Sequence, residues 1–188
     1  MNATDPVTDP VEGVNEGVNE GVKNSPPFAM ITNAFTCTGP YAILILAGVK
    51  FAENRCGMPV ERKGRCAISV SKGFSNGEYA RFIAWANETF GVWWCVNNLW
   101  DWDEVREWRG KIVATCDYEA VAKIPDEPKW KKQCAFWNEG YPNWWLLSNI
   151  RRLPTPIPCR GNVGMWPLTE ELSAAVSASE EERLQHSA

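Results

Sequence analysis

The spacing of apolar and polar positions divides the chain into short segments, most of them with the two-residue period of β-strands. In residues 65–72, Cys66, Ile68 and Val70 alternate with small or polar neighbours, which predicts a strand. Further strands are predicted over residues 28–35, 110–117, 144–152 and 163–168. The three prolines of residues 154–158 indicate an extended edge segment after the strand predicted over residues 144–152.

Two segments have helical patterns instead. Residues 40–47 are apolar on every side, begin at Pro40 and end before Gly48, which predicts a short helix buried all round. Residues 78–87 place their apolar side chains on one helix face. Several short strands, one or two helices and no βαβ rhythm predict a mainly β (α+β) domain, a small β-barrel flanked by short helices.

The ends of the chain differ in composition from its middle. Residues 11–22 repeat a Glu-Gly-Val-Asn unit that has too few apolar side chains to fold, so residues 1–26 are predicted to be a disordered acidic tail. Residues 169–188 are predicted to be an acidic C-terminal tail. One domain over residues 27–168 remains, in keeping with a length of 188 residues and 45% hydrophobic content.

The net charge of −4 conceals a basic middle. Residues 1–25 hold five acids and one Lys, and residues 169–188 hold five acids and one Arg, so 13 acids and 17 bases remain between them. This excess of about +4 suits an anionic ligand, although a solvated basic surface explains it equally well.

Several classes of chemistry have little support in the sequence. The seven cysteines are scattered without a C-x-x-C pair, which disfavours zinc binding and a disulfide scaffold, and no metal or cofactor is predicted. Neither a secretory signal nor a membrane span is evident, so a cytoplasmic protein is expected. Because the one histidine is His186, near the C-terminus, chemistry would depend on Lys, carboxylates, hydroxyls or thiols.

Tryptophan is concentrated in one region, since ten of the eleven lie within residues 85–145 or at its ends. Such residues could form an aromatic cage or a platform on which bases stack. The alternative, favoured for most of them, is that a β-rich domain fills its core with indoles. The acidic residues among them argue against a phosphate-facing surface in this stretch.

The most distinctive charges follow the short helix directly. Lys50, Glu53 and Arg55 lie within six residues, carried by a rigid apolar support. They could form a functional site. The alternative is a surface ion pair between Glu53 and one of the two bases, which would contribute little to stability.

Four segments together resemble the ASCH domains of the PUA-like superfamily. Gly48, Lys50, Glu53 and Arg55 match the family's G-x-K-x-x-E-x-R motif, and residues 40–42 are similar to its P-[WY]-A helix start. Residues 65–72 resemble its RG-strand-SK segment. Residues 148–151 and 156–161 resemble its SNPR and PIP-x-[KR]-G ending, so the resemblance covers residues 28–168.

The resemblance implies a PUA-like β-barrel with a cleft lined by the G-x-K-x-x-E-x-R loop. It also implies one of several activities: RNA or DNA binding, removal of the acetyl group of N4-acetylcytidine by an amidohydrolase, or ribonuclease action. In the amidohydrolase, the residue three positions after the motif lysine is a threonine. In this chain that position is Glu53.

Two main hypotheses follow. In the first, the cleft binds single-stranded RNA, another single-stranded nucleic acid or a nucleotide: Lys50, Arg55, Lys72 and Arg151 hold phosphate, Glu53 accepts from a base amino group, and Ser71 and Asn149 complete the site. In the second, a hydrolase of a modified nucleoside or a metal-independent ribonuclease uses Lys50 and Glu53 as catalytic residues. A protein-interaction role for the tails and the oligomeric state stay open.

Overall fold

One six-stranded sheet forms the centre of the computed structural model, which describes residues 30–55, 63–138, 140–141 and 143–185. Its strands are β1 (Asn33–Cys37), β2 (Ala52–Arg55), β3 (Lys63–Val70), β4 (Lys111–Val121), β5 (Asn143–Pro158) and β6 (Met165–Pro167). They lie in the order β2-β5-β4-β3-β1-β6, with only β1 and β3 parallel among the described pairs. The predicted segments 65–72, 110–117 and 144–152 coincide with β3, β4 and β5, except that residues 71–72 and 110 lie just outside the strands.

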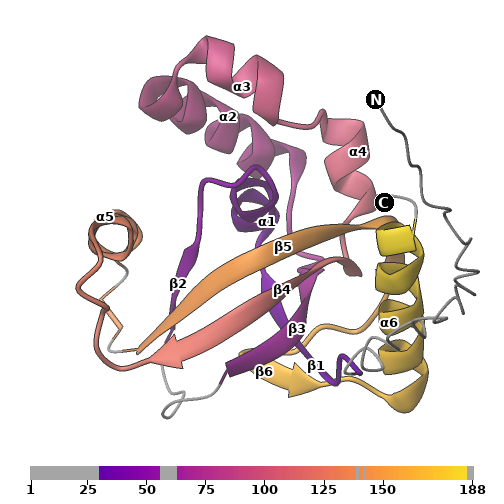
Figure 1. Ribbon diagram of the computed structural model, residues 1–188. Helices are drawn as coiled ribbons and strands as arrows, with labels where there is room; N and C mark the ends of the chain where they lie inside the picture. The colour runs from indigo at the N-terminus through magenta and orange to yellow at the C-terminus, as the bar shows by residue number, and fades with distance from the viewer. Residues whose placement is uncertain (1–29, 56–62, 139, 142, 186–188) are drawn as a thin grey trace, which may run out of the picture.

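The sheet curls into a half-barrel, and the described strands leave it open between β2 and β6 (Figure 1). The α+β class predicted from the sequence is confirmed, with a curled sheet flanked by helices. Long β5 accounts for much of the curvature, because the β4–β5 register shifts at two places.

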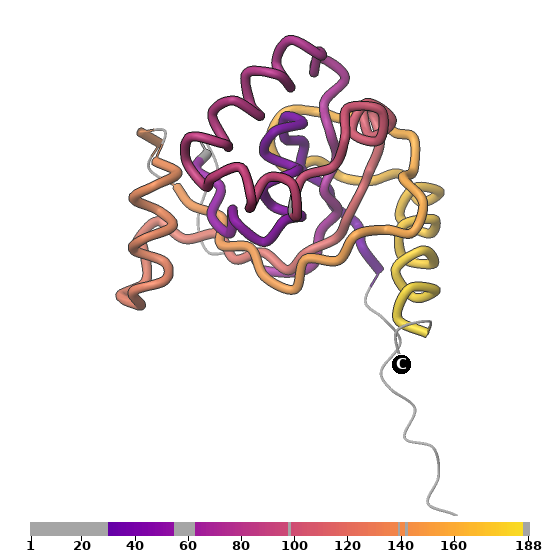
Figure 2. The backbone as a smooth tube through the Cα atoms, turned by 90° about the horizontal axis from the view of Figure 1, so that it is seen from above, coloured from indigo at the N-terminus to yellow at the C-terminus, as the bar shows by residue number. Residues whose placement is uncertain are grey.

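Six helices occur in the described part of the chain: α1 (Gly39–Leu46), α2 (Asn76–Phe90), α3 (Val92–Asn98), α4 (Trp102–Glu107), α5 (Pro128–Phe136) and α6 (Glu170–Gln185). The first four gather over the concave side of the sheet, with α1 nearest to it (Figure 1). Figure 2 shows α5 and α6 at opposite sides of the molecule. None of the helices in the described ranges is long and apolar enough to cross a membrane.

The main core fills the space between the sheet and helices α1, α2 and α4. Residues 42–45 of α1 are all buried, as the uniform apolar pattern predicts. Trp108 and Trp145 are among the largest fully buried side chains, whereas Trp93 on α3 is 79% exposed. The tryptophan-rich stretch therefore supplies core residues, but not all of its indoles are buried.

The predicted acidic C-terminal tail differs from what the structure shows, since residues 170–185 form α6 and pack on the outer face of the sheet. Val176 is fully buried there beside Leu153 and Trp166. The apolar positions of α6 are too sparse to form a clear stripe, which is why the pattern did not indicate a packed helix. The predicted N-terminal tail lies outside the described residues.

We predict that Gly39→Ala lowers stability, because the new Cβ would lie 2.3 Å from Cδ1 of Phe74, which is itself buried. Overpacking of this kind costs about 1–3 kcal/mol. Thermal unfolding should show a loss of about 2–4 °C in Tm for each kcal/mol. Gly73→Ala is the control, because a Cβ there meets nothing within 4 Å; equal Tm values for the two variants would contradict the prediction.

Candidate functional site

The glycine of the G-x-K-x-x-E-x-R motif, Gly48, ends α1 and turns the chain back towards the core. Gly48 has φ +68°, in the left-handed region, and its N–H donates to Ile45 O at 3.0 Å. The next N–H, of Val49, donates to Leu44 O at 2.9 Å. These two bonds are the pattern of a Schellman cap, whose left-handed position favours glycine. The reversal leaves Lys50 on the inner side of the turn, between α1 and β2.

Lys50 is fully buried, and its ammonium group is surrounded by specific partners. Its Nζ donates to Ala52 O at 2.9 Å and lies 3.1 Å from Glu53 Oε2. The rings of Tyr41 and Trp137 lie on it, each with its centroid 4.6 Å from Nζ. Cation–π contacts of this kind strengthen when the cation is removed from water. The Lys50–Glu53 ion pair is therefore buried, and it is not the surface ion pair that was the alternative interpretation of the sequence.

Helix α5 fixes one of the two rings. Gln133 Oε1 accepts from the Trp137 Nε1–H at 3.1 Å and from the Phe51 N–H at 3.0 Å, so a single side chain ties the indole to the backbone beside Lys50. Cys134 is also close. Burial raises the pKa of its thiol to about 11, although the charge of Lys50 acts in the opposite direction. The thiol therefore stays protonated at neutral pH and is a poor nucleophile.

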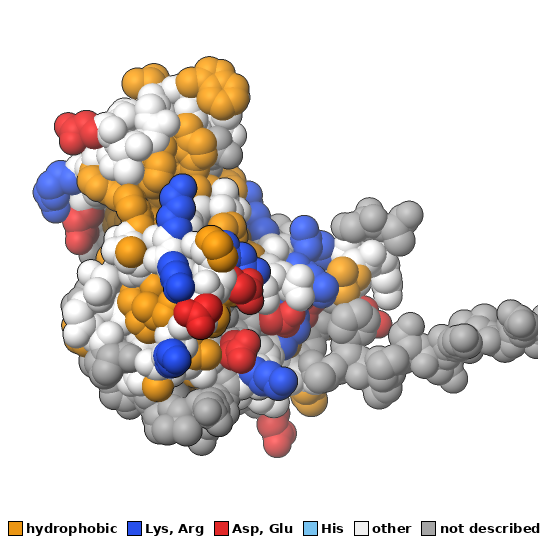
Figure 3. All heavy atoms as spheres, turned by 60° about the vertical axis from the view of Figure 1, so that its left-hand side comes forward, with side chains coloured by type: hydrophobic (Ala, Val, Ile, Leu, Met, Phe, Trp, Pro, Cys, Tyr) orange, Lys and Arg blue, Asp and Glu red, His pale blue; other side chains and the backbone are white. Residues whose placement is uncertain are grey.

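A cavity of about 530 Å³ is lined in part by Tyr41 and Trp137. Its lining comes from α1, α2 and the end of α5, and consists of Pro40, Tyr41, Leu44, Arg81, Phe82, Trp85, Phe136, Trp137 and Asn138. Hydrophobic side chains gather on the side of the molecule seen in Figure 3, where the edge near α5 comes forward. Trp85 is 36% exposed and Phe136 53% exposed, so aromatic surface is accessible from solvent. We call this cavity the aromatic pocket.

The structure places the remaining predicted site residues elsewhere. Ser71 and Lys72 follow β3 and line a different cavity of about 580 Å³, together with Arg160. The Ser71 N–H donates to Cys37 O, and Lys72 packs over Gly110. Arg55 ends β2, and its side chain lies outside what the structure describes.

Asn149 and Arg151 belong to a third group, on the outer face of the sheet. Asn149, with φ +46°, occupies a β-bulge in β5, and its side chain donates to Asp117. Arg151 donates to Glu180 Oε1 at 3.2 Å. The predicted residues thus divide among three places, and the described contacts join only Lys50 with Glu53.

Glu180 of α6 is the centre of that outer group, although it is only 3% exposed. The Arg65 Nε–H donates to both of its carboxylate oxygens, at 2.8 and 2.9 Å, and the Thr115 hydroxyl donates to Oε1 at 2.8 Å. Burial alone would raise the pKa of Glu180, but the hydrogen bonds from Arg65 and Thr115 outweigh it and hold the pKa below its ordinary value. For Asp117 the balance is similar. Burial raises its pKa, but the hydrogen bonds from Asn149 and Arg65 have the larger effect, so the pKa lies below its ordinary value.

Sequence reasoning singled out Lys50 and Glu53 but not the groups that surround them. Tyr41 was recognised only as part of a helix start, and nothing local marked Gln133 or Trp137, which lie more than 80 residues further along the chain. Glu180 was assigned to a tail. Within the described residues, no group of three or more His, Cys, Asp or Glu side chains is placed to hold a metal ion.

Comparisons with known proteins give structural matches alone. No family model matches the sequence, and no curated protein matches it either. The matching solved structures include two from Zymomonas mobilis. They are of ASCH, at 11% identity and a TM-score of 0.41, and of a mutant protein of ZmASCH, at 10% identity and a TM-score of 0.42. Each covers 78% of this chain, and 93% and 94% of its own length respectively.

The chain is similar to ASCH structures. The ASCH-like motif around Lys50 lies beside the aromatic pocket, and the SNPR-like segment lies on the outer face with Glu180.

We predict that Glu180 stabilises the fold in a pH-dependent way. A carboxyl whose folded pKa lies below its unfolded value stabilises the protein above the unfolded pKa, here 4.5, and loses that contribution as the pH falls through the folded pKa. Glu180→Gln should reduce the free energy of unfolding by about 1.5–3 kcal/mol at pH 7, the range for hydrogen bonds to charged groups.

Urea unfolding measured from pH 7 to pH 3 checks this, because the gap between wild type and Glu180→Gln should shrink once the pH falls below 4.5. Glu181→Gln is the matched control, since Glu181 is exposed on the same helix. A gap that is constant over the whole range would show that the carboxylate charge makes no such contribution.

Proposed function

We propose that the aromatic pocket binds a nucleobase, either in single-stranded RNA or in a nucleotide. The observation that carries this proposal is a fully buried motif lysine that is paired with a carboxylate and contacts two of the aromatic rings that line the pocket. Every base has a π-face, and stacking on an aromatic side chain is worth about 1–3 kcal/mol per base.

The burial of Lys50 and Glu53 supports a functional role for this part of the fold. Removing two charges from water is expensive, and apolar residues of similar volume often stabilise a core as well as a buried ion pair does. Stability alone therefore gives little reason for the pair. In our proposal its function is to hold the Tyr41 and Trp137 rings in place, so that the floor of the pocket is rigid before a base arrives.

The rest of the pocket suits the same ligand. Trp85 and Phe136 offer exposed aromatic surface, and Asn138 provides an amide that can read a base edge. Arg81 is exposed at the same cavity and carries the charge that a phosphate needs. This set differs from the phosphate contacts expected from sequence, because Lys72 and Arg151 lie at other places.

Hydrolysis of a modified nucleoside has less support from the described contacts. The recorded partners of Lys50 Nζ are a carbonyl oxygen, a carboxylate and two ring faces, which suit a donor and a cation rather than a proton acceptor. Among the described residues that line the aromatic pocket, Tyr41 alone carries a hydroxyl, and none carries a thiol. We therefore favour binding over catalysis at this site.

We predict that Trp85→Ala weakens binding of a fluorescein-labelled single-stranded RNA by about 10- to 100-fold, the equivalent of one lost stacking contact. Fluorescence anisotropy at fixed salt measures the change. Trp93→Ala is the matched control, because Trp93 is 79% exposed on α3 and does not line the pocket. If both variants bind like wild type, or both lose affinity equally, the pocket is not where the base binds.

We also predict that purified protein does not deacetylate N4-acetylcytidine and does not cleave single-stranded RNA. Chromatography of the products after long incubation measures both reactions. Turnover that survives in Lys50→Arg would be assigned to a contaminant or to another site. Turnover present in wild type and abolished in this variant would instead make Lys50 a catalytic residue and overturn the binding proposal.

A further inference from the structure

The outer group contains donors from three strands that converge on a single carboxylate. Arg65 comes from β3, Thr115 from β4 and Arg151 from β5, and all three donate to Glu180. The Arg65 Nε–H donates to Oε2 and the Nη2–H to Oε1, which is the forked manner in which guanidinium groups bind carboxylates and phosphates alike. Three convergent donors of this kind would bind any oxyanion of suitable size.

Two of the donors, Arg65 and Thr115, are held by contacts within the sheet as well as by α6. The Arg65 Nη1–H donates to Asp117 Oδ1 at 2.7 Å, and the Nη2–H donates to Thr115 Oγ1 at 2.8 Å. The β-bulge at Asn149 sets the direction of the strand next to Arg151, and Asn149 binds Asp117 in turn. The contacts that hold Arg65 and Thr115 in the sheet would therefore remain if Glu180 moved away.

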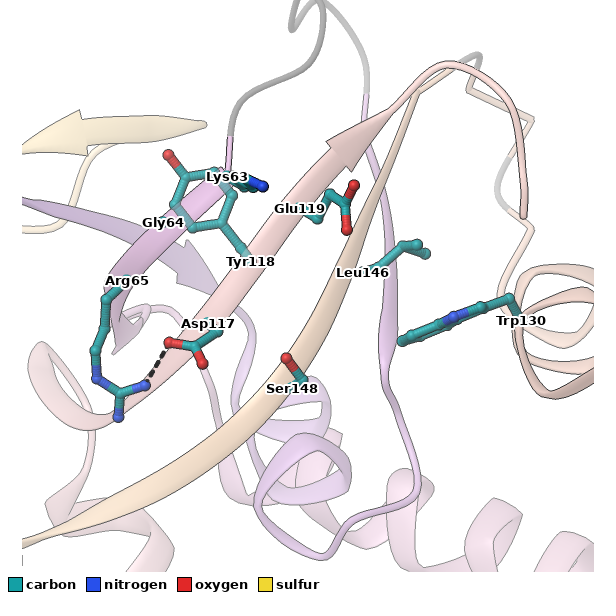
Figure 4. Close-up of a pocket in the computed structure, with 9 residues that line it drawn as sticks. All are labelled: Lys63, Gly64, Arg65, Asp117, Tyr118, Glu119, Trp130, Leu146 and Ser148. Atoms are coloured by element: carbon teal, nitrogen blue, oxygen red, sulfur yellow. Dashed lines mark hydrogen bonds and ion pairs between the residues drawn. The ribbon is translucent and has the colours of Figure 1, made fainter. Parts of the chain in front are cut away.

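The site is open to solvent on one side. The Arg65 and Arg151 side chains are 16% and 29% exposed. A cavity of about 380 Å³ begins at Arg65 and Asp117, and extends past Ser148 towards Trp130 on α5. Figure 4 shows Arg65 and Asp117 at one end of this cavity and Lys63 and Trp130 among its other walls. A ligand bound at the arginines could extend along it.

We propose that Arg65, Thr115 and Arg151 form a phosphate-binding site, and that the Glu180 carboxylate of α6 occupies this site until a phosphate displaces it. The charges agree with such an exchange. Two arginines are balanced by Asp117 and Glu180 in the closed state, and removal of Glu180 leaves one net positive charge. The phosphate can belong to a nucleic acid strand or to a free mononucleotide. The proposal is independent of the base proposed for the aromatic pocket.

Helix α6 is attached in a way that permits its release. Its buried residues are Ser173, Val176 and Glu180, and only Val176 among them is apolar. Ser173 Oγ donates to Ile31 O at 2.7 Å, and Ser177 Oγ accepts from the Ile31 N–H at 3.1 Å. Segments with few buried apolar contacts open at a low free-energy cost. The ion pairs of Glu180 are thus a large part of what holds α6 on the sheet.

The first test is anisotropy of labelled oligouridylate with the full-length Glu180→Gln variant. We expect about tenfold tighter binding than wild type and a steeper salt dependence by about one phosphate contact. Glu181→Gln removes the same charge from the same helix without touching the arginines, and should bind like wild type. Equal gains in both variants would attribute the effect to general charge and overturn the proposal.

Two further arms identify the site and the ligand. Adding Arg151→Gln to Glu180→Gln should abolish the gain in oligouridylate affinity. Adding Trp85→Ala should lower the overall affinity but leave the gain caused by Glu180→Gln intact. If only Trp85→Ala abolished the gain, the additional binding would be assigned to the aromatic pocket. Competition with uridine monophosphate and with inorganic phosphate distinguishes the sources. Displacement of the oligonucleotide by either indicates a site for free phosphate groups, and displacement by neither indicates a strand site.

A measurement on the wild-type protein keeps the proposal testable if Glu180→Gln does not fold. A ligand that competes with Glu180 must loosen α6, so the amide hydrogen exchange of residues 170–185 should accelerate as oligouridylate is added. Exchange in β4 should not accelerate. Unchanged or slower exchange in α6 under saturating ligand would show that Glu180 is a structural anchor and does not compete for the site.

Discussion

The buried charge of Lys50 constrains how α1, β2 and the end of α5 pack together. An ammonium group at 0% exposure requires a carboxylate, a carbonyl and polarizable surface within a few ångströms, and three elements supply these groups. Glu53 comes from β2, Tyr41 from α1 and Trp137 from the end of α5. The same requirement brings α5 against the edge of the sheet and creates the wall of the aromatic pocket.

Much of this arrangement could be predicted, because its determinants are local in sequence. The all-round apolar pattern of residues 40–47 predicted the buried helix, and Gly48 predicted where it ends. The spacing of Lys50 and Glu53 indicated that they could form an ion pair. Two-residue periodicity located most of the sheet. What failed was long-range: Trp137 reaches Lys50 through the tertiary packing of α5, and no periodicity in residues 128–137 indicates which face meets the lysine.

The C-terminal helix shows a second reason for incomplete prediction. Its sequence is rich in Ala, Ser and Glu, so acidic composition and a weak apolar stripe both suggested a tail. The packing of α6 on the sheet relies on the buried Val176 and on the ion pairs of Glu180 with Arg65 and Arg151. Arg65 and Arg151 lie 86 residues apart, and only the pairing of β4 with both β3 and β5 brings them together.

Strand β5 connects the two regions physically. Its Leu147 N–H donates to Phe51 O, next to Lys50. A few residues later, the bulge at Asn149 and the side chain of Arg151 form part of the outer group around Glu180. A strand has two faces with alternating side chains, so one element can support a buried aromatic site and a polar surface site at once. The acidic α6 covers the polar face of a domain whose middle has an excess of bases. In our proposal the chain carries its own competitor for anions at the outer face, whereas the aromatic pocket is lined by α1, α2 and the end of α5, and α5 lies on the opposite side of the molecule from α6 (Figure 2).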